Sequence, residues 1–137
     1  MIHPWPILRS QPAGDYRIFN IRSETRRSPR TGAEQDFYLI DCTHWVNVIA
    51  VTTDGRLVMI DQFRHGSNTV ELEIPGGMMD PHEHSPVESA VRELREETGY
   101  EGGNPVLIGD IFPNPAIMTN VCHTVLVEGC EQRHPTA

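Results

Sequence analysis

Length, composition and charge exclude several classes of protein. The chain has 137 residues, enough for one domain with a modest core. Its formal net charge of -8 at pH 7 excludes a general nucleic-acid binder, which needs a basic surface. No apolar run approaches the length of a membrane span, so a soluble protein is expected. The three cysteines have neither metal-type spacing nor an even number, which favours a reducing cytoplasm.

Strand patterns dominate the chain. The segment 22–35 is polar and rich in arginine, and Pro29 and Gly32 break it, so a connection is expected there. Thr53-Asp54-Gly55 is a tight-turn signal, which predicts that 56–64 pairs antiparallel with the strand before it. A Gly-Gly loop is expected at 76–77. The predicted strands are 15–21, 37–41, 45–52, 56–64, 70–74, 106–112 and 121–128.

One helix is signalled at both ends. Ser85-Pro86-Val87-Glu88 forms a capping box with proline at the first helical position. Gly99 supplies the stop signal. One continuous stripe is predicted to pack against the rest of the protein, and it consists of Val87, Ala90, Val91, Leu94 and Thr98.

Three glutamates share another face of this helix. Glu93, Glu96 and Glu97 are spaced i, i+3 and i+4. Like charges at these spacings cost a few tenths of a kcal/mol per pair, and the helix dipole disfavours anions in the last turn. Two interpretations stay open: a solvated acidic face, or a site for a hard divalent cation such as Mg²⁺ that acts beside substrate phosphates.

The glutamates belong to a longer segment that resembles the Nudix box of the Nudix hydrolases, G-x5-E-x7-R-E-U-x-E-E-x-G-U, where U is bulky and apolar. The matching positions are Gly77, Glu83, Arg92, Glu93, Leu94, Glu96, Glu97, Gly99 and Tyr100. Eight residues instead of seven separate Glu83 from Arg92. Because the inserted residue falls among His84 and Ser85, before the helix, the helical register of the glutamates is unchanged.

The resemblance continues outside the box. Gln62-Phe63-Arg64 and the segment 71–77 are similar to the Q-Y/F-R and E-L/I-P-x-G segments of the ADP-ribose and nucleoside diphosphate sugar pyrophosphatase branch, and roughly residues 16–127 can be laid along it. The implied fold class is α+β: a mixed β-sheet sandwiched between helices (α/β/α), with N-terminal antiparallel strands. The implied single Nudix domain spans 1–137, with N-terminal strands over 1–44 as a homodimer contact and the core over 45–137, including the box at 77–100. We expect the C-terminal strand and helix of the usual fold, with their water-activating glutamate, to be absent.

This branch implies hydrolysis of a nucleoside diphosphate linked to another moiety, most simply ADP-ribose to AMP and ribose 5-phosphate. By the resemblance, the cofactor is Mg²⁺ or Mn²⁺, and the partner is a small-molecule nucleotide. The implied catalytic residues are Arg92, Glu93, Glu96 and Glu97, with the Gly76 carbonyl as a further metal ligand. Two alternatives stay open: a nucleoside triphosphate or dinucleotide pyrophosphohydrolase, and a non-catalytic module that binds ADP-ribose or a nucleotide.

The role of each supporting residue also has an alternative. Arg92 orients the carboxylates or makes a surface ion pair. Arg64 is a predicted substrate-binding residue because a guanidinium fork suits phosphate oxygens, and otherwise it faces solvent. Glu73, also predicted to bind substrate, could instead bind metal or hold Arg64. His82-Glu83-His84 lacks the further ligands that zinc requires.

Two more groups of residues could contact substrate. The arginines of the predicted connection could reach phosphates, or they belong to a mobile solvated loop: Arg22, Arg26, Arg27 and Arg30. Three aromatic residues could stack on a nucleobase, although core packing is the better interpretation: Phe19, Phe37 and Trp45.

Overall fold

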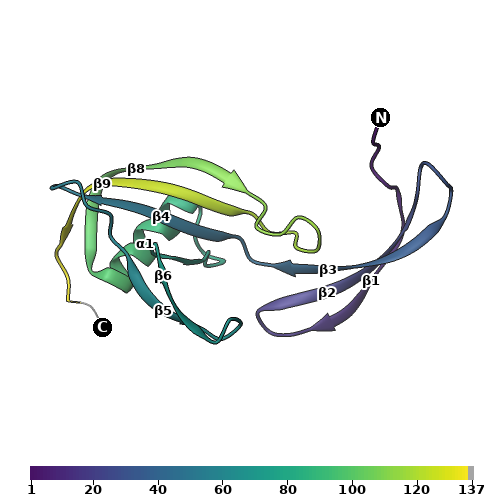
Figure 1. Cartoon of the computed structure of the whole chain (residues 1–137), viewed down its shortest axis with the longest axis horizontal. Helices are drawn as coiled ribbons and strands as arrows, with labels where there is room; N and C mark the ends of the chain where they lie inside the picture. Colours follow the sequence, from purple (N-terminus) through teal and green to yellow (C-terminus); the bar gives the residue numbers. More distant parts are fainter. Residues whose placement is uncertain (136–137) are drawn as a thin grey trace. The chain divides into compact units, whose positions relative to one another are not determined.

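The structure, a computed structural model, describes residues 1–135 and contains one helix and nine strands within them (Figure 1). The chain forms two compact units: residues 1–43 with 112–120, and residues 44–111 with the segment from Val121 onward. The elements are β1 (Ile7–Asp15), β2 (Phe19–Arg27), β3 (Glu34–Cys42), β4 (Trp45–Thr52), β5 (Ile60–Arg64), β6 (Thr69–Glu73), β7 (Gly76–Met78), α1 (Pro86–Thr98), β8 (Tyr100–Ile111) and β9 (Cys122–Gln132).

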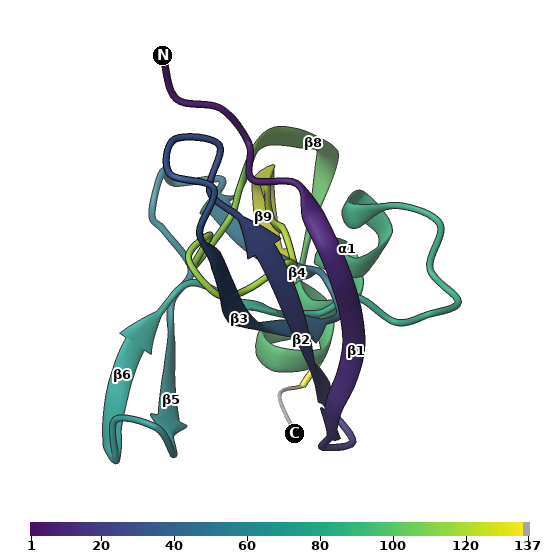
Figure 2. The same cartoon turned by 90° about the vertical axis from the view of Figure 1, so that its right-hand side faces the viewer.

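The first unit is a three-stranded antiparallel sheet in the order β1-β2-β3 (Figure 2). The strand predicted over 15–21 is only partly correct, since residues 19–21 begin β2. The chain turns at 16–18, where the Tyr16 amide donates to the Phe19 carbonyl at 2.9 Å and Arg17 has a φ of 64°. The connection predicted over 22–35 is also mostly wrong, since β2 continues to Arg27.

An ion-pair cluster on β2 explains why the arginine-rich segment is a strand. Glu24 is only 3% exposed and accepts from Arg22 Nε at 2.9 Å and from Arg26 Nη2 at 2.5 Å. Arg22 also pairs with Asp41 on β3. A buried carboxylate requires such partners. The interpretation of these arginines as part of a mobile solvated loop is therefore wrong for Arg22, Arg26 and Arg27, which all lie on β2.

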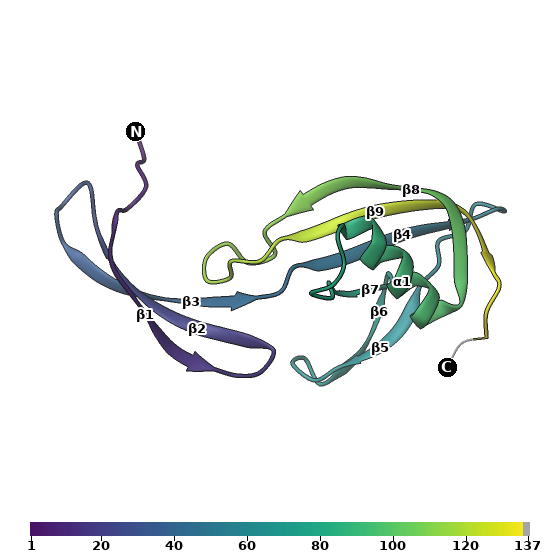
Figure 3. The same cartoon turned by 180° about the vertical axis from the view of Figure 1, so that it is seen from behind.

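The second unit contains a mixed sheet in the order β7-β4-β9-β8, with β4 parallel to β9 and the other pairs antiparallel. Helix α1 packs against all four strands on one face of this sheet (Figure 3). The buried core of this unit consists of Val46, Val48, Ala50, Val58, Ala90, Leu94, Val125, Val127 and Cys130. The predicted α+β class and mixed sheet are confirmed, but the expected helices on both faces are not, since α1 is the only helix within residues 1–135.

The turn predicted after β4 is present, but the pairing predicted beyond it is only partly correct. Gly55 has a φ of 80°, its amide donates to the Thr52 carbonyl at 2.9 Å, and the Val58 amide donates to the Ala50 carbonyl at 2.9 Å. After Val58 the chain leaves β4, and β5 pairs with β6 as a separate hairpin. The chain after Val58 does not pair further with β4, because β7 pairs with residues 45–47 of β4 on one side and β9 pairs with β4 on the other.

The ends of α1 agree with the sequence prediction. The Ser85 hydroxyl accepts from the Glu88 amide at 3.2 Å, and Gly99 ends the helix with a φ of 70°. The Glu88 carboxylate accepts from the His84 amide at 2.9 Å instead of the Ser85 amide, which shifts that half of the capping box by one residue. In the predicted stripe Ala90, Leu94 and Thr98 are buried, whereas Val91 is 39% exposed. Val91 lies outside the line of residues i, i+4 and i+8 that faces the sheet. No helix in residues 1–135 has the length and apolar character to cross a membrane.

Candidate active site

The free edge of β7 carries the backbone groups of the candidate site. The Gly-Gly segment expected as a loop is a strand that pairs with β4 through Val46 and Gly77. The Val48 amide donates to the Pro75 carbonyl at 2.8 Å, and the Met79 amide donates to the His44 carbonyl at 2.9 Å. Because antiparallel hydrogen-bonded pairs alternate along the ladder, the N–H and C=O groups of residues 76 and 78 point away from β4. This edge therefore presents free backbone donors and acceptors to α1.

Both glycines of β7 are required by close packing. A Cβ atom on Gly76 would lie 2.3 Å from the carbonyl oxygen of Val46, and a Cβ on Gly77 would lie 2.3 Å from Glu93 Oε1. The first contact is with backbone, and the second is with the end of a flexible side chain. Glycine at these positions allows β7 to approach β4 and allows Glu93 to rest directly on the strand.

Glu97 meets the same edge. The Gly76 amide donates to Glu97 Oε2 at 3.0 Å. Burial raises the pKa of the Glu97 carboxyl, the hydrogen bond from Gly76 opposes this rise, and the negative charge of Glu93 adds to it. A half-buried carboxylate with another carboxylate beside it favours protonation or a bound cation.

Arg92 connects the helix to the loop before it. Its Nε donates to Glu83 Oε1 at 2.6 Å, and its Nη1 lies 2.9 Å from Glu93 Oε1 and 3.0 Å from Glu96 Oε2. Its Nη2 donates to the Met78 carbonyl at 3.2 Å. Arg92 thus makes more than a single surface ion pair, because it ties three carboxylates to the free edge of β7.

Glu83 is held firmly despite the extra residue before the helix. It accepts from the Asp80 amide at 2.6 Å and from the Ser89 hydroxyl at 2.5 Å, in addition to Arg92. The hydrogen bond from Arg92 lowers the pKa of Glu83 to about 2, and the pairing with Glu83 raises the pKa of Arg92. The inserted residue is accommodated at His84, whose amide is bonded to Glu88.

The three glutamates do not converge on one point. Within residues 1–135 no group of three His, Cys, Asp or Glu side chains is arranged to hold a metal ion. Glu96 is 59% exposed at its side chain and is held beside Glu93 by Arg92, whereas Glu97 turns toward Gly76. The oxygen atoms nearest the free edge, from Glu93, Glu97 and the Gly76 carbonyl, are nevertheless hard donors of the kind that Mg²⁺ prefers. His82 and His84 are exposed, and the zinc alternative gains no support.

A cavity of about 410 Å³ adjoins this edge. Its lining includes Trp45 and Asn47 from β4, Arg64 and Glu73 from the β5–β6 hairpin, and Gly76. Arg64 donates to Glu73 through Nε at 2.8 Å and through Nη2 at 2.6 Å. The structure therefore brings together both predicted substrate-binding residues and one edge of the predicted metal site.

Sequence reasoning missed Asn47 and assigned Trp45 to the core, but both line this cavity. The available signal was an asparagine in the middle of an otherwise apolar strand. The other two aromatic candidates lie in the first unit, where Phe37 packs edge-on against Trp5 and Phe19 stacks on Tyr16.

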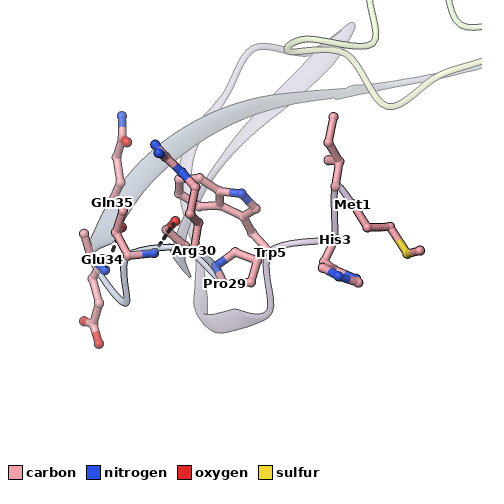
Figure 4. A pocket seen from close by; sticks show the side chains of 11 residues that line it. Met1, His3, Trp5, Pro29, Arg30, Glu34 and Gln35 are labelled. Atoms are coloured by element: carbon pink, nitrogen blue, oxygen red, sulfur yellow. Dashed lines mark hydrogen bonds between the residues drawn. The ribbon is translucent and has the colours of Figure 1, made fainter.

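The first unit has a cavity of its own, of about 490 Å³, beside the turn at 28–33 (Figure 4). Trp5, Arg30 and Gln35 line it, and the Ser28 amide closes the turn by donating to the Ala33 carbonyl at 2.8 Å. None of the residues around it is a predicted catalytic, metal-binding or substrate-binding residue except Arg30, which the sequence associates only loosely with phosphate.

Comparison with known proteins shows the family of the chain. The NUDIX domain family model matches residues 43–136, and the chain therefore belongs to the Nudix family. It is 36% identical over 83 residues to the ADP-ribose pyrophosphatase of Bacillus subtilis (strain 168), an alignment that covers 61% of this chain and 44% of that protein. It is 32% identical over 92 residues to the methanol dehydrogenase activator of Bacillus methanolicus, covering 67% of this chain and 49% of the relative.

The fold has a close counterpart among solved structures. The crystal structure of an ADP compounds hydrolase superposes with a TM-score of 0.84 at 20% identity, and the match covers 100% of this chain and 74% of the other. At this identity the likeness concerns the fold. The chain spans about half the length of the two curated relatives.

Proposed function

We propose that this protein is a metal-dependent pyrophosphohydrolase that cleaves ADP-ribose, or a related nucleoside diphosphate sugar, to a nucleoside monophosphate and a sugar phosphate. The observation that carries the proposal is the meeting of Glu93 and Glu97 at the free edge of β7, beside a cavity that holds Arg64. A solvated acidic face would not need a dedicated arginine to hold its carboxylates, nor glycines that let them rest on a strand.

The chemistry requires positive charge next to a phosphoric anhydride. A divalent cation, Mg²⁺ or Mn²⁺, held by the carboxylates of Glu93, Glu96 and Glu97 and by the Gly76 carbonyl, would neutralise phosphate oxygens and lower the pKa of an attacking water. Arg92 orients Glu93 and Glu96, with which it pairs, while the Gly76 amide holds Glu97. Glu83 in turn fixes Arg92.

The substrate assignment rests on the relatives and the cavity together. A curated relative is named an ADP-ribose pyrophosphatase, and the cavity offers one guanidinium for a phosphate and an aromatic and an amide side chain, Trp45 and Asn47, for the moiety beyond it. A second relative carries a different name, methanol dehydrogenase activator, so the substrate has to be established by direct comparison.

We extend the proposal to the protein's assembly and compartment. The N-terminal strands over residues 1–44 provide the contact of a homodimer. The three free cysteines, Cys42, Cys122 and Cys130, suit a reducing cytoplasm. Sedimentation or mass measurement in solution tests the dimer.

Product analysis tests the activity. ADP-ribose, other nucleoside diphosphate sugars, dinucleotides and nucleoside triphosphates are each incubated with Mg²⁺, Mn²⁺ or chelator. We expect metal-dependent release of AMP and ribose 5-phosphate from ADP-ribose, and its loss in Glu93→Gln but not in the matched Glu88→Gln variant of the same helix. If only triphosphates or dinucleotides are cleaved, the proposed substrate class is wrong and the protein is a pyrophosphohydrolase of those compounds. Binding without turnover of any compound would contradict the enzyme assignment.

A further inference from the structure

Arg64 is the one basic residue among those that line the cavity in the described chain, and Glu73 holds it. The two residues belong to opposite strands of the β5–β6 hairpin, in which Ile60 pairs with Glu73 and Arg64 pairs with Thr69. Both carboxylate oxygens of Glu73 are used, at 2.8 Å from Nε and 2.6 Å from Nη2. The contact is therefore a two-point fork with a fixed geometry.

Only one edge of the Arg64 guanidinium makes this fork, so its other edge is free to bind a ligand. A guanidinium has five N–H donors in one plane. Glu73 takes one from Nε and one from Nη2, and Nη1 has no hydrogen-bond partner within residues 1–135. An anion in the cavity can therefore bind Nη1 without displacing Glu73.

The ion pair between Arg64 and Glu73 contributes little to the stability of the fold. The side chains of Arg64 and Glu73 are 47% and 29% exposed, and ion pairs of this kind contribute little to stability. The hydrogen bond from Arg64 lowers the pKa of Glu73.

On the basis of the hydrolysis proposed above, we propose that Glu73 is a positioning residue: it holds Arg64 by its Nε and Nη2 edge, so that Nη1 is preset to bind one phosphoryl group of a nucleoside diphosphate. Glu73 then acts through Arg64 and does not bind substrate or metal itself. This role refines the sequence prediction that grouped the two residues as substrate ligands.

Calorimetry with α,β-methylene-ADP in Mg²⁺ tests the proposal without relying on turnover, since this analogue has no cleavable bond between its two phosphorus atoms. Glu73→Gln should weaken binding about three- to tenfold, the factor that corresponds to the net contribution of one ordinary hydrogen bond. With ADP-ribose as substrate, KM should rise by a similar factor while kcat stays within about twofold. Glu71→Gln is the matched control, because it removes the same charge from the same strand, has no contact with Arg64 and should change neither quantity.

The double variant separates positioning from direct contact. In an Arg64→Ala background, Glu73→Gln should have no further effect on analogue binding. An equal loss in both backgrounds would show that Glu73 acts independently of Arg64, and tighter binding by Glu73→Gln alone would show that Glu73 competes with the phosphate; either result overturns the proposal. Absence of analogue binding by the unaltered protein would overturn it as well. Failure to cleave ADP-ribose with intact analogue binding would instead count against the proposed function alone.

Discussion

Glu97→Gln should abolish activity while leaving the stability of the fold nearly unchanged, because the negative charge of Glu97 lies at an unfavourable position in the helix. Its like-charge contact with Glu93 at i, i+4 costs about 0.2–0.5 kcal/mol. Its place in the last turn of α1 costs about 0.3–1 kcal/mol through the helix dipole. Glutamine removes both costs but weakens the hydrogen bond from the Gly76 amide, a loss of about 0.5–1 kcal/mol. The free energy of unfolding should therefore stay within about 1 kcal/mol of the original value.

Urea unfolding in chelator measures this change, and ADP-ribose hydrolysis in Mg²⁺ measures the activity. Activity should fall at least about a hundredfold, because a metal ligand supports several kcal/mol of charge stabilisation. Glu88→Gln is a control of opposite sign: Glu88 lies in the favourable first turn and accepts from the His84 amide, so this variant should be less stable by about 0.5–1 kcal/mol and remain active. A loss of more than about 2 kcal/mol in Glu97→Gln, or full retention of turnover, would refute this reasoning.

Three further predictions concern neighbouring parts of the structure. Glu83→Gln should lower the free energy of unfolding at pH 7 by about 1.5–3 kcal/mol. Since the folded pKa of Glu83 is about 2 and its ordinary value is 4.5, the stabilisation is complete above pH 4.5 and is lost as the pH falls toward 2. The free energies of unfolding of the two proteins, measured in urea, should therefore converge over that range, and a constant difference between them would contradict the prediction. Gly76→Ala should lower the stability of the fold by about 1–3 kcal/mol because its Cβ meets backbone. Gly77→Ala should lower it by less than about 1 kcal/mol, yet displace Glu93 and impair activity. Thermal melts and activity assays check this, and a larger loss of stability in Gly77→Ala than in Gly76→Ala would contradict it. Asn120→Leu should raise the melting temperature, since the asparagine is 1% exposed and its amide has no hydrogen-bond partner in residues 1–135, and a lowered melting temperature would refute this.

Local signals in the sequence were sufficient to predict the helix and both of its ends. Ser85 and Gly99 mark the ends of α1 because capping depends on neighbouring residues only, and the box spacing fixes the faces of Arg92 and the glutamates. The extra residue before the helix did not disturb Glu83, which still accepts from the Asp80 amide and from Arg92.

Long-range contacts account for what the sequence did not reveal. Residues 22–27 have the composition of a loop, but they pair with β1 and β3 on both sides, and Glu24 is buried between two arginines. The Gly-Gly segment is a strand because β4 offers it an edge. Glu96 is separated from Glu97 because Arg92 pairs with Glu96 while the Gly76 amide binds Glu97. Helical periodicity alone does not predict these contacts.

The position of β4 has a consequence for the order in which the site can be built during synthesis. β4 lies between β7 and β9, and its parallel partner ends at Gln132, far beyond the last box glutamate. Pairing over such a sequence separation is slow to close. A nascent chain that has emerged only as far as α1 holds every predicted ligand but lacks the strand that completes the platform beneath them. Shortening the protein within β9 should therefore disable the site as completely as removing a glutamate.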